Sequence, residues 1–140
     1  MSAGTGVVHS EFNASEVEPS HSIQIWIEPS AEDFAPRYQQ VAFSPADKRG
    51  RLLPLAGPNN AATIIHQDAR LLASELMPNE SVTHTILPGR HAYVQVVQGD
   101  ILLNGQELHY GDGAALSDES SIAFKGVGEI GGEFLVFDLK

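Results

Sequence analysis

Hydrophobic and polar residues alternate in short runs along most of the chain, and turn residues separate these runs. Alternation with a period of two residues is typical of β-strands that have one buried face. In the run 21–27, the three isoleucines share one face with His21, and Trp26 lies on the opposite face. The expected strands are 6–11, 21–27, 38–43, 61–66, 70–76, 81–87, 91–97, 100–103, 106–110, 114–116, 121–124 and 133–139.

Glycine, proline and asparagine residues mark the turns between these runs. Asn104-Gly105 between two apolar runs is a strong hairpin signal, because a type I′ turn requires a positive φ at both central residues. The segment 47–50 is also expected to be a turn, and Pro36 limits the helix candidate at 31–34 to one turn. Many short strands at intervals of roughly 8–12 residues favour a β-sandwich or barrel. The predicted fold class is therefore all-β.

Length and composition restrict the class of protein. The 140 residues carry 18 acidic and 8 basic side chains, and the formal net charge is −10. Such a surface repels polyanions, so we expect no direct nucleic-acid partner and no membrane partner. The chain has no cysteine, which excludes disulfides, thiolate metal sites and cysteine nucleophiles. Neither a secretory leader nor a bilayer-spanning apolar run is visible, so we expect a cytoplasmic protein.

The triplet His9-Ser10-Glu11 is the most informative group of polar residues. On a strand, residues i and i+2 project to the same face, so His9 and Glu11 can converge on one ion. An imidazole and a carboxylate suit Fe(II), Mn or Zn, and at least one further ligand has to come from elsewhere. The same pattern is common in surface strands that bind no ligand, and the residues alone leave this alternative open.

The other histidines give weaker signals. His21 and His66 lie at strand ends, where structural hydrogen bonds are the simpler expectation. His84, His91 and His109 each stand apart from other possible ligands, and no two of the six histidines have the spacing H-x-H. The sequence also has no serine-hydrolase elbow, phosphate-binding loop or zinc-protease motif.

The segment 85–124 resembles a cupin barrel in the order of its strands and glycine turns. Cupins bind a metal through an H-x-H pair, a following Glu and a later His. Alignment on the glycine turns gives four ligand positions, which fall on Thr85, Leu87, Ala92 and Ile122. Leucine, alanine and isoleucine side chains have no lone pairs to donate, so this barrel is expected to be free of metal.

Several stretches resemble the pirin family, in particular its bacterial quercetinase-like members. These stretches are 1–13 with His9-Ser10-Glu11, 21–27, 36–38 and 66–68, and the resemblance continues to 137–139. It implies two cupin barrels, of which only the first holds a metal, usually iron. Residues 1–45 would then be the remnant of an N-terminal metal-binding barrel, and residues 46–140 a complete C-terminal barrel without a metal site.

The family resemblance also implies a chemistry. Pirins hold their metal with an H-x-H pair and with the His and Glu of the triplet, which makes His9 and Glu11 the expected metal ligands. The implied cofactor is Fe(II) or another divalent metal, and the implied substrate is a small aromatic, flavonol-like compound of a quercetin 2,3-dioxygenase. Glu11 would also act as a catalytic residue by accepting a hydroxyl proton from the substrate. The expected H-x-H pair is missing, so water, His21 or a second chain would complete the site.

Two interpretations of function remain open. In the first, the chain belongs to a metal-dependent dioxygenase and is inactive alone, because half of its metal site is missing. In the second, it is a non-catalytic cupin module that binds a protein partner or a small ligand, as is reported for some pirins. A start codon assigned too late, a truncated gene or a short paralogue would each account for the missing pair.

An incomplete first barrel has a physical consequence. Residues 1–43 would leave strand edges unpaired and an apolar face bare, which favours pairing with another chain. We therefore predict a homodimer or a strand-exchanged oligomer that pairs through residues 6–28.

Overall fold

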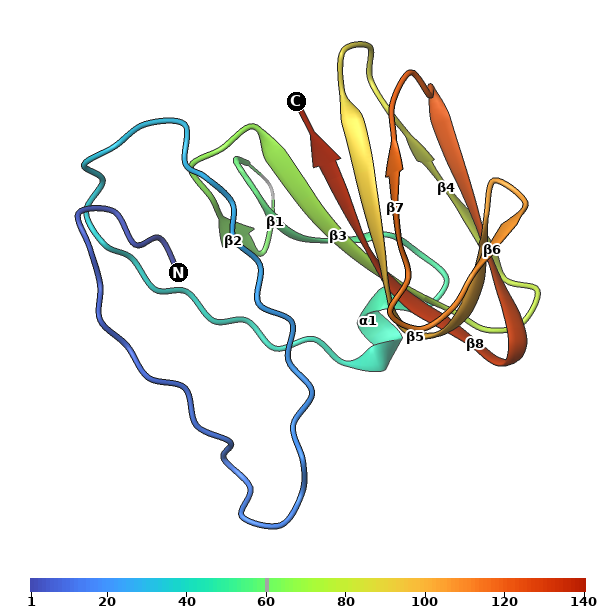
Figure 1. Ribbon diagram of the computed structural model, residues 1–140, viewed down its shortest axis with the longest axis horizontal. Helices are drawn as coiled ribbons and strands as arrows, with labels where there is room; N and C mark the ends of the chain where they lie inside the picture. Colours follow the sequence, from blue (N-terminus) through green and yellow to red (C-terminus); the bar gives the residue numbers. More distant parts are fainter. Residues whose placement is uncertain (60) are drawn as a thin grey trace.

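The computed structural model describes residues 1–59 and 61–140, which form a β-barrel preceded by a long extended segment (Figure 1). The elements are α1 (Pro45–Lys48), β1 (Leu53–Gly57), β2 (Thr63–Ile64), β3 (Ala69–Leu76), β4 (Ser81–Thr85), β5 (His91–Leu103), β6 (Gln106–Leu108), β7 (Gly113–Leu116) and β8 (Ser121–Leu139). Strands dominate the described residues, and the all-β prediction is confirmed. No helix in this part of the chain has the length and apolar character that crossing a bilayer requires.

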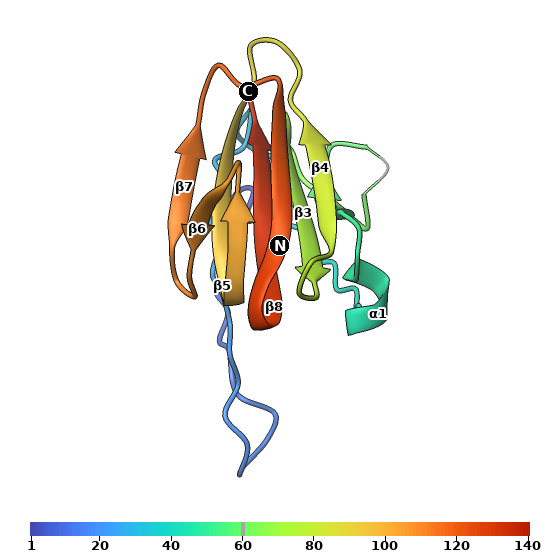
Figure 2. The same cartoon turned by 90° about the vertical axis from the view of Figure 1, so that its right-hand side faces the viewer.

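The long strands β5 and β8 run through both layers of the barrel. Residues 132–139 of β8 pair with β3 and with the first part of β5, residues 91–99. Residues 121–127 of β8 pair with β4 and with the end of β5, residues 100–103. The strand order is β2-β1-β3-β8-β5-β6, and β7 pairs with β5. In Figure 2, β3 and β4 lie on one side of β8, and β5, β6 and β7 lie on the other.

Glycine allows β8 to change layers. Residues 128–131 bulge out of its ladder with β5, where the register shifts after Gly99. Gly131 has φ +77° and packs so closely against β3 that a Cβ atom would overlap the carbonyl oxygen of Leu76. A side chain at this position is therefore excluded both by the left-handed backbone and by the neighbouring strand.

Two apolar clusters stabilise the barrel. The first fills the interior between the two layers and consists of Leu72, Leu76, Ile86, Ala92, Val94, Val96, Ile101, Leu103, Ile122, Phe124, Phe134 and Val136. Within it the rings of Phe124 and Phe134 stack at a centroid distance of 4.5 Å. The second cluster lies on the outer face of β1, β3 and β8, and consists of Ala56, Leu71, Ala73 and Leu135. Burial of these side chains is the main favourable contribution to the stability of the fold.

The hairpin prediction is confirmed, whereas two pairs of expected strands are merged. Asn104 and Gly105 have φ values of +48° and +85° and connect β5 to β6, as a type I′ turn requires. The runs 91–97 and 100–103 are one strand, β5. The runs 121–124 and 133–139 are likewise the two ends of β8. The turn residues between these runs form bulges rather than chain reversals, because both strands continue across the layers.

Residues 1–43, here called the N-terminal arm, contain no strand, although 6–11, 21–27 and 38–43 were predicted as strands. The sole ladder-type contact within the arm is an isolated bridge between Ser2 and Arg37. These predictions were wrong for the single chain, because a strand forms only where a second strand pairs with its backbone. Figure 1 shows the arm as an open loop beside the barrel.

The short-range predictions around residue 40 were also wrong. Residues 30–32 form bends in place of the helical turn expected at 31–34, and the predicted turn 47–50 is helical at 47–48 and a turn at Gly50. Helix α1 begins after Ser44, whose backbone N–H and hydroxyl group both donate to the carboxylate of Asp47 at 2.7 Å. These hydrogen bonds lower the pKa of Asp47, with the side-chain bond from Ser44 as the main cause. A cap of this kind starts a helix where composition alone indicated a turn.

Candidate functional site

The triplet His9-Ser10-Glu11 lies on the exposed outer part of the N-terminal arm. The chain reverses just after Glu11, because the side chain of Asn13 accepts from the N–H of Ser15 at 3.1 Å and donates to a later carbonyl group. The hydroxyl group of Ser15 in turn accepts from the N–H of Glu18 at 2.8 Å. Short polar side chains that bond to their own backbone are typical of turns. His9 and Glu11 therefore lie next to a turn, and their side chains are exposed to solvent.

His9 and Glu11 are the candidate metal ligands of the N-terminal arm. No group of three or more His, Asp or Glu side chains within residues 1–59 and 61–140 is placed to hold a metal ion. His21, a further expected ligand, instead contacts Tyr110 edge-on, with 6.2 Å between ring centroids. An imidazole and a carboxylate are suitable donors for a divalent transition metal, but a stable site needs more ligands. His9 and Glu11 are therefore two candidate ligands, and the segment that holds them is not the strand on which their shared face was predicted.

The middle of the arm is fixed to the barrel through the segment after β2. The ring of Phe34 stacks on His66 with 4.0 Å between centroids and an interplanar angle of 11°. The carbonyl oxygen of His66 accepts from the N–H of Ser30 at 2.7 Å, and the side chain of Gln67 donates to the carbonyl oxygen of Glu28 at 2.8 Å. His66 is thus a structural anchor, in agreement with the expectation from its position in the sequence.

The interior of the barrel differs from the sequence prediction at one pair of positions. Ala92 and Ile122 are buried in the first cluster, as their predicted ligand positions require. The other pair was misplaced by one residue: Leu87 is 53% exposed, and its neighbour Ile86 is 3% exposed. Inward and outward side chains alternate along β4 and onward to residues 86 and 87. His84 therefore lies in the interior, and Thr85 does not. His91 is exposed and bonds to the hydroxyl group of Ser117, with 2.9 Å between Nδ1 and Oγ.

His84 belongs to a polar group at one end of the barrel, here called the buried ion cluster: His84, Asp138 and Arg90 lie in the interior, and Asp68, whose side chain is 49% exposed, lies at its edge. Asp138 is 1% exposed; its Oδ2 lies 2.9 Å from Nε2 of His84, and its Oδ1 accepts from Nε of Arg90. The guanidinium of Arg90 also donates to Oδ1 of Asp68 at 2.8 Å and to the carbonyl oxygen of Asp138 at 3.0 Å. The cluster joins the loop before β3, the end of β4, the loop before β5 and the end of β8.

The charges within the buried ion cluster stabilise one another. Burial alone would lower the pKa of Arg90, but the hydrogen bonds that Arg90 donates to Asp138 and Asp68 outweigh it and raise this pKa above its usual value. The hydrogen bond from Arg90 likewise lowers the pKa of Asp68. Sequence reasoning did not find this cluster. The one available signal was the position of Asp138, which shares an inward face of β8 with Phe134 and Val136.

A second ion pair, between His109 and Asp100, leads to a prediction about pH. The two side chains are exposed, and Nδ1 of His109 lies 2.8 Å from Oδ1 of Asp100. This hydrogen bond is the main cause of a raised pKa of His109, relative to the ordinary value of 6.5. The pair therefore contributes its stability fully below pH 6.5 and loses it as the pH rises through the raised pKa of the folded state.

An NMR titration is expected to give a pKa of His109 above 6.5 in the wild type. In Asp100→Asn this pKa is expected to return toward 6.5. Glu119→Gln, which removes a carboxylate outside the groups that act on His109, serves as the control and leaves the titration unchanged. Identical His109 titrations in the wild type and in Asp100→Asn would show that the ion pair does not form in solution.

Comparison with known proteins relates the chain to quercetinases and pirins. The family model described as the quercetinase C-terminal cupin domain matches residues 55–139. The quercetin 2,3-dioxygenase of Escherichia coli (strain K12) is 37% identical over 140 residues, which cover 99% of this chain and 59% of that protein. A putative quercetin 2,3-dioxygenase of Pasteurella multocida is 39% identical over 142 residues, with the same coverage of 99% and 59%.

Solved structures give the same result. The crystal structure of YhhW from Escherichia coli superposes with a TM-score of 0.73 at 30% identity and covers 82% of this chain and 48% of its own. The bacterial pirin YhhW in complex with nickel(II) superposes with a TM-score of 0.70 at 29% identity, over 79% and 47% of the two chains. The fold is thus that of a cupin. The chain belongs to the pirin family, and it spans 59% of the length of its relative in Escherichia coli.

Proposed function

We propose that this chain is part of a metal-dependent dioxygenase of the quercetinase type, to which it contributes two metal ligands, His9 and Glu11. The observation that carries the proposal is this exposed donor pair, in a chain whose similarity to quercetin 2,3-dioxygenases extends over 99% of its length. A nickel(II) complex of a related bacterial pirin supports a divalent metal in the family. Residues 1–45 would form the metal-binding part, and residues 46–140 a C-terminal barrel without a metal.

In the proposed enzyme, a divalent metal such as Fe(II) supplies Lewis acidity and one-electron chemistry toward a flavonol-like substrate and oxygen. His9 would hold the metal through a ring nitrogen, and Glu11 through a carboxylate oxygen. The carboxylate of Glu11 would also accept the proton of a substrate hydroxyl group. Since the described residues bring no third ligand to this pair, we propose that the missing ligands come from outside these 140 residues. The chain alone would then not turn over a flavonol.

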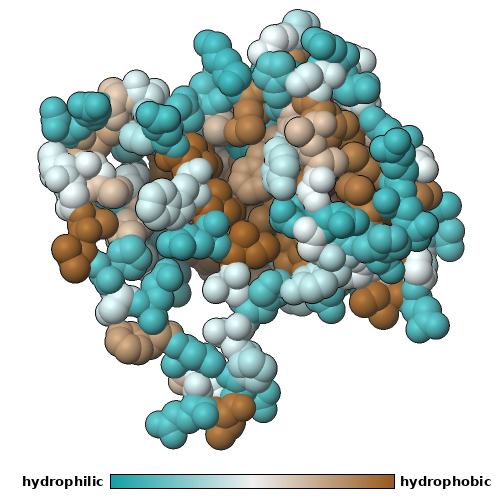
Figure 3. All heavy atoms as spheres, in the orientation of Figure 1, coloured by the Kyte–Doolittle hydropathy of each residue, from teal (hydrophilic) through white to brown (hydrophobic). Residues whose placement is uncertain are grey.

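The state of the arm supports an association with a second chain. Val8, Phe12 and Trp26 are 102%, 88% and 88% exposed, although large apolar side chains are usually buried. Figure 3 shows apolar side chains both along the arm and in the region where the arm meets the barrel. Backbone without strand partners and exposed apolar side chains together favour strand pairing. We therefore propose a homodimer or a strand-exchanged oligomer that pairs through residues 6–28.

The metal ligands can be tested without an activity assay. We expect the chain, in the proposed homodimer whose second copy supplies further ligands, to bind Ni(II) in competition with a colorimetric chelator, and His9→Ala and Glu11→Gln each to weaken this binding about tenfold or more. Glu16→Gln is the matched control, because Glu16 is an exposed carboxylate on the same arm. Its affinity is expected to equal that of the wild type. Unchanged Ni(II) affinity in both His9→Ala and Glu11→Gln would overturn the assignment.

A second function is favoured by the barrel interior. Ile86, Ala92 and Ile122 are each at most 3% exposed and fill the end of the barrel that holds the buried ion cluster. The guanidinium of Arg90 already places a positive charge next to His84 and Asp138, which opposes the binding of a cation there. These contacts support a C-terminal barrel that acts as a non-catalytic module and binds a protein partner or a small ligand.

A further inference from the structure

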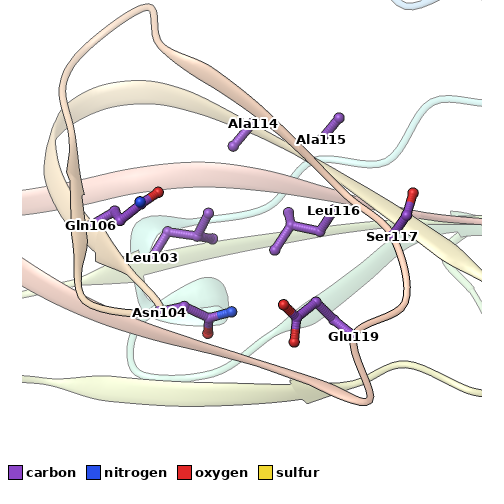
Figure 4. Close-up of a pocket in the computed structure, with 8 residues that line it drawn as sticks. All are labelled: Leu103, Asn104, Gln106, Ala114, Ala115, Leu116, Ser117 and Glu119. Atoms are coloured by element: carbon purple, nitrogen blue, oxygen red, sulfur yellow. The ribbon is translucent and has the colours of Figure 1, made fainter.

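A cavity of about 380 Å³ lies at the edge of the barrel, between the hairpin that joins β5 to β6 and the end of β7 (Figure 4). Strands β6 and β7 both pair with β5 and not with each other, so the two layers of the barrel separate here. The size falls in the range of roughly 300–1,000 Å³ that small-molecule sites occupy, and barrel mouths are frequent locations for such sites. No residue of the N-terminal arm lines this cavity, which is therefore distinct from the proposed metal ligands.

The floor of the cavity is apolar. Leu103 is 4% exposed and belongs to the interior cluster, and Ala114 and Leu116 pack against the same cluster. In Figure 4, the side chains of Leu103 and Leu116 approach each other across this floor. This floor is small, because Leu103 is almost fully buried, and it accepts no more than one small aromatic or branched aliphatic group.

The rim is polar and is held in place by hydrogen bonds. Oδ1 of Asn104 accepts from the N–H of Ala123 at 2.8 Å, which orients the side-chain amide, and Oγ of Ser117 bonds to His91. Figure 4 shows the carboxylate of Glu119 and the amide of Asn104 facing each other over the cavity. In the part of the chain that the structure describes, Glu119 forms no ion pair. A fixed amide and one negative charge therefore face each other above an apolar floor, whereas the hydroxyl group of Ser117 is engaged with His91.

From this arrangement we infer that the cavity binds a small organic cation with an apolar body, of the arylalkyl ammonium class. The ammonium group pairs with the carboxylate of Glu119, and the aryl group packs on Leu103 and Leu116. The net charge of −10 adds a general attraction for cations and disfavours anionic ligands. This inference does not depend on the metal site, because it concerns a different part of the molecule.

Three probes of similar shape test the inference: phenethylammonium, 2-phenylethanol and phenylacetate, which are cationic, neutral and anionic. Each is titrated into the whole chain near neutral pH and followed by the backbone amide resonances of Asn104, Ser117 and Glu119. We expect phenethylammonium to bind saturably with a Kd on the order of 1 mM, which is ordinary for a probe of this size. The neutral probe should bind about threefold to fivefold more weakly, as expected for an exposed ion pair, and the anionic probe more weakly still.

Two variants separate the local charge from the general field. Glu119→Gln should make phenethylammonium and 2-phenylethanol bind equally, because the side-chain shape is kept and the charge is lost. Glu107→Gln is the matched control, since Glu107 is an exposed carboxylate on neighbouring β6 that does not line the cavity. It should leave the preference for the cation intact. Equal binding of the three probes, the same loss in both variants, or no response of the cavity resonances would each overturn the inference.

Discussion

Replacement of Asp138 by asparagine is expected to destabilise the barrel by about 3–5 kcal/mol, the usual cost of removing one partner from a buried ion pair. The carboxylate is 1% exposed and is bonded to both Arg90 and His84, and the side chain of Arg90 is itself 9% exposed. In Asp138→Asn the guanidinium keeps its charge and its buried position, loses its buried charged partner and retains only the half-exposed carboxylate of Asp68. The weaker compensation of this buried charge, rather than the loss of a favourable contact, accounts for most of the expected effect.

This effect is measured as the free energy of unfolding in urea. Far-ultraviolet circular dichroism is the appropriate probe, because Trp26 lies on the arm, is 88% exposed, and does not report on the barrel. Glu129→Gln, which removes an exposed carboxylate on β8, is the control and is expected to change the stability by less than about 0.5 kcal/mol.

A double variant checks the cause. Arg90→Met combined with Asp138→Leu removes both charges, and it is expected to be less destabilised than the sum of the two single variants. A free energy of unfolding of Asp138→Asn within about 0.5 kcal/mol of the wild type would contradict the burial of this ion cluster in solution.

Replacement of Gly131 by alanine is expected to cost more than about 3 kcal/mol of stability. Two effects add at this position. A residue with a Cβ atom is strained at φ +77°, and the Cβ atom would also overlap the carbonyl oxygen of Leu76, a backbone atom of β3 that cannot move without opening the ladder between β3 and β8.

Gly111 provides a matched control for this prediction. It has φ +86°, and an added Cβ atom would meet nothing within 4 Å. Gly111→Ala therefore carries the backbone strain without the overlap and is expected to cost about 1 kcal/mol. Equal unfolding free energies for the two alanine variants would contradict the close packing of β8 on β3.

The parts of the fold that local sequence determines were predictable. Asn104-Gly105 indicates its hairpin because two neighbouring residues carry the whole conformational requirement of the turn. The inward positions of β5 and β8 are predictable for the same reason, since the alternation of buried and exposed side chains within one strand is a local property. The all-β cupin fold and the membership of the pirin family followed from patterns of this kind.

The features that depend on distant residues were not predictable. The alternation of 21–27 is that of a strand, but this segment remains unpaired in the single chain because no other segment offers its backbone. The buried ion cluster joins residues that are up to 70 positions apart, between Asp68 and Asp138, and its members have no common spacing. The error of one residue at Leu87 has the same origin: glycine turns anchored the alignment, whereas the pairing of β4 with β8 sets the register.

The candidate metal site likewise has a part that local sequence indicates and a part that depends on distant residues. His9 and Glu11 could be singled out because the two donors are neighbours in the sequence. The ligands that would complete their site cannot be read from a local pattern, and the described residues bring no third donor to them. The proposed strand pairing through residues 6–28 is the physical route by which a second chain would reach this pair.

The central claim is that the arm carries two metal ligands that act in association with a second chain, and the most direct test is to measure metal content and solution mass together on the purified 140-residue protein. We predict a dimeric or larger mass at micromolar concentration, and Ni(II) binding that the double variant His9→Ala with Glu11→Gln abolishes. A monomer whose Ni(II) binding is unchanged in the double variant would contradict the account.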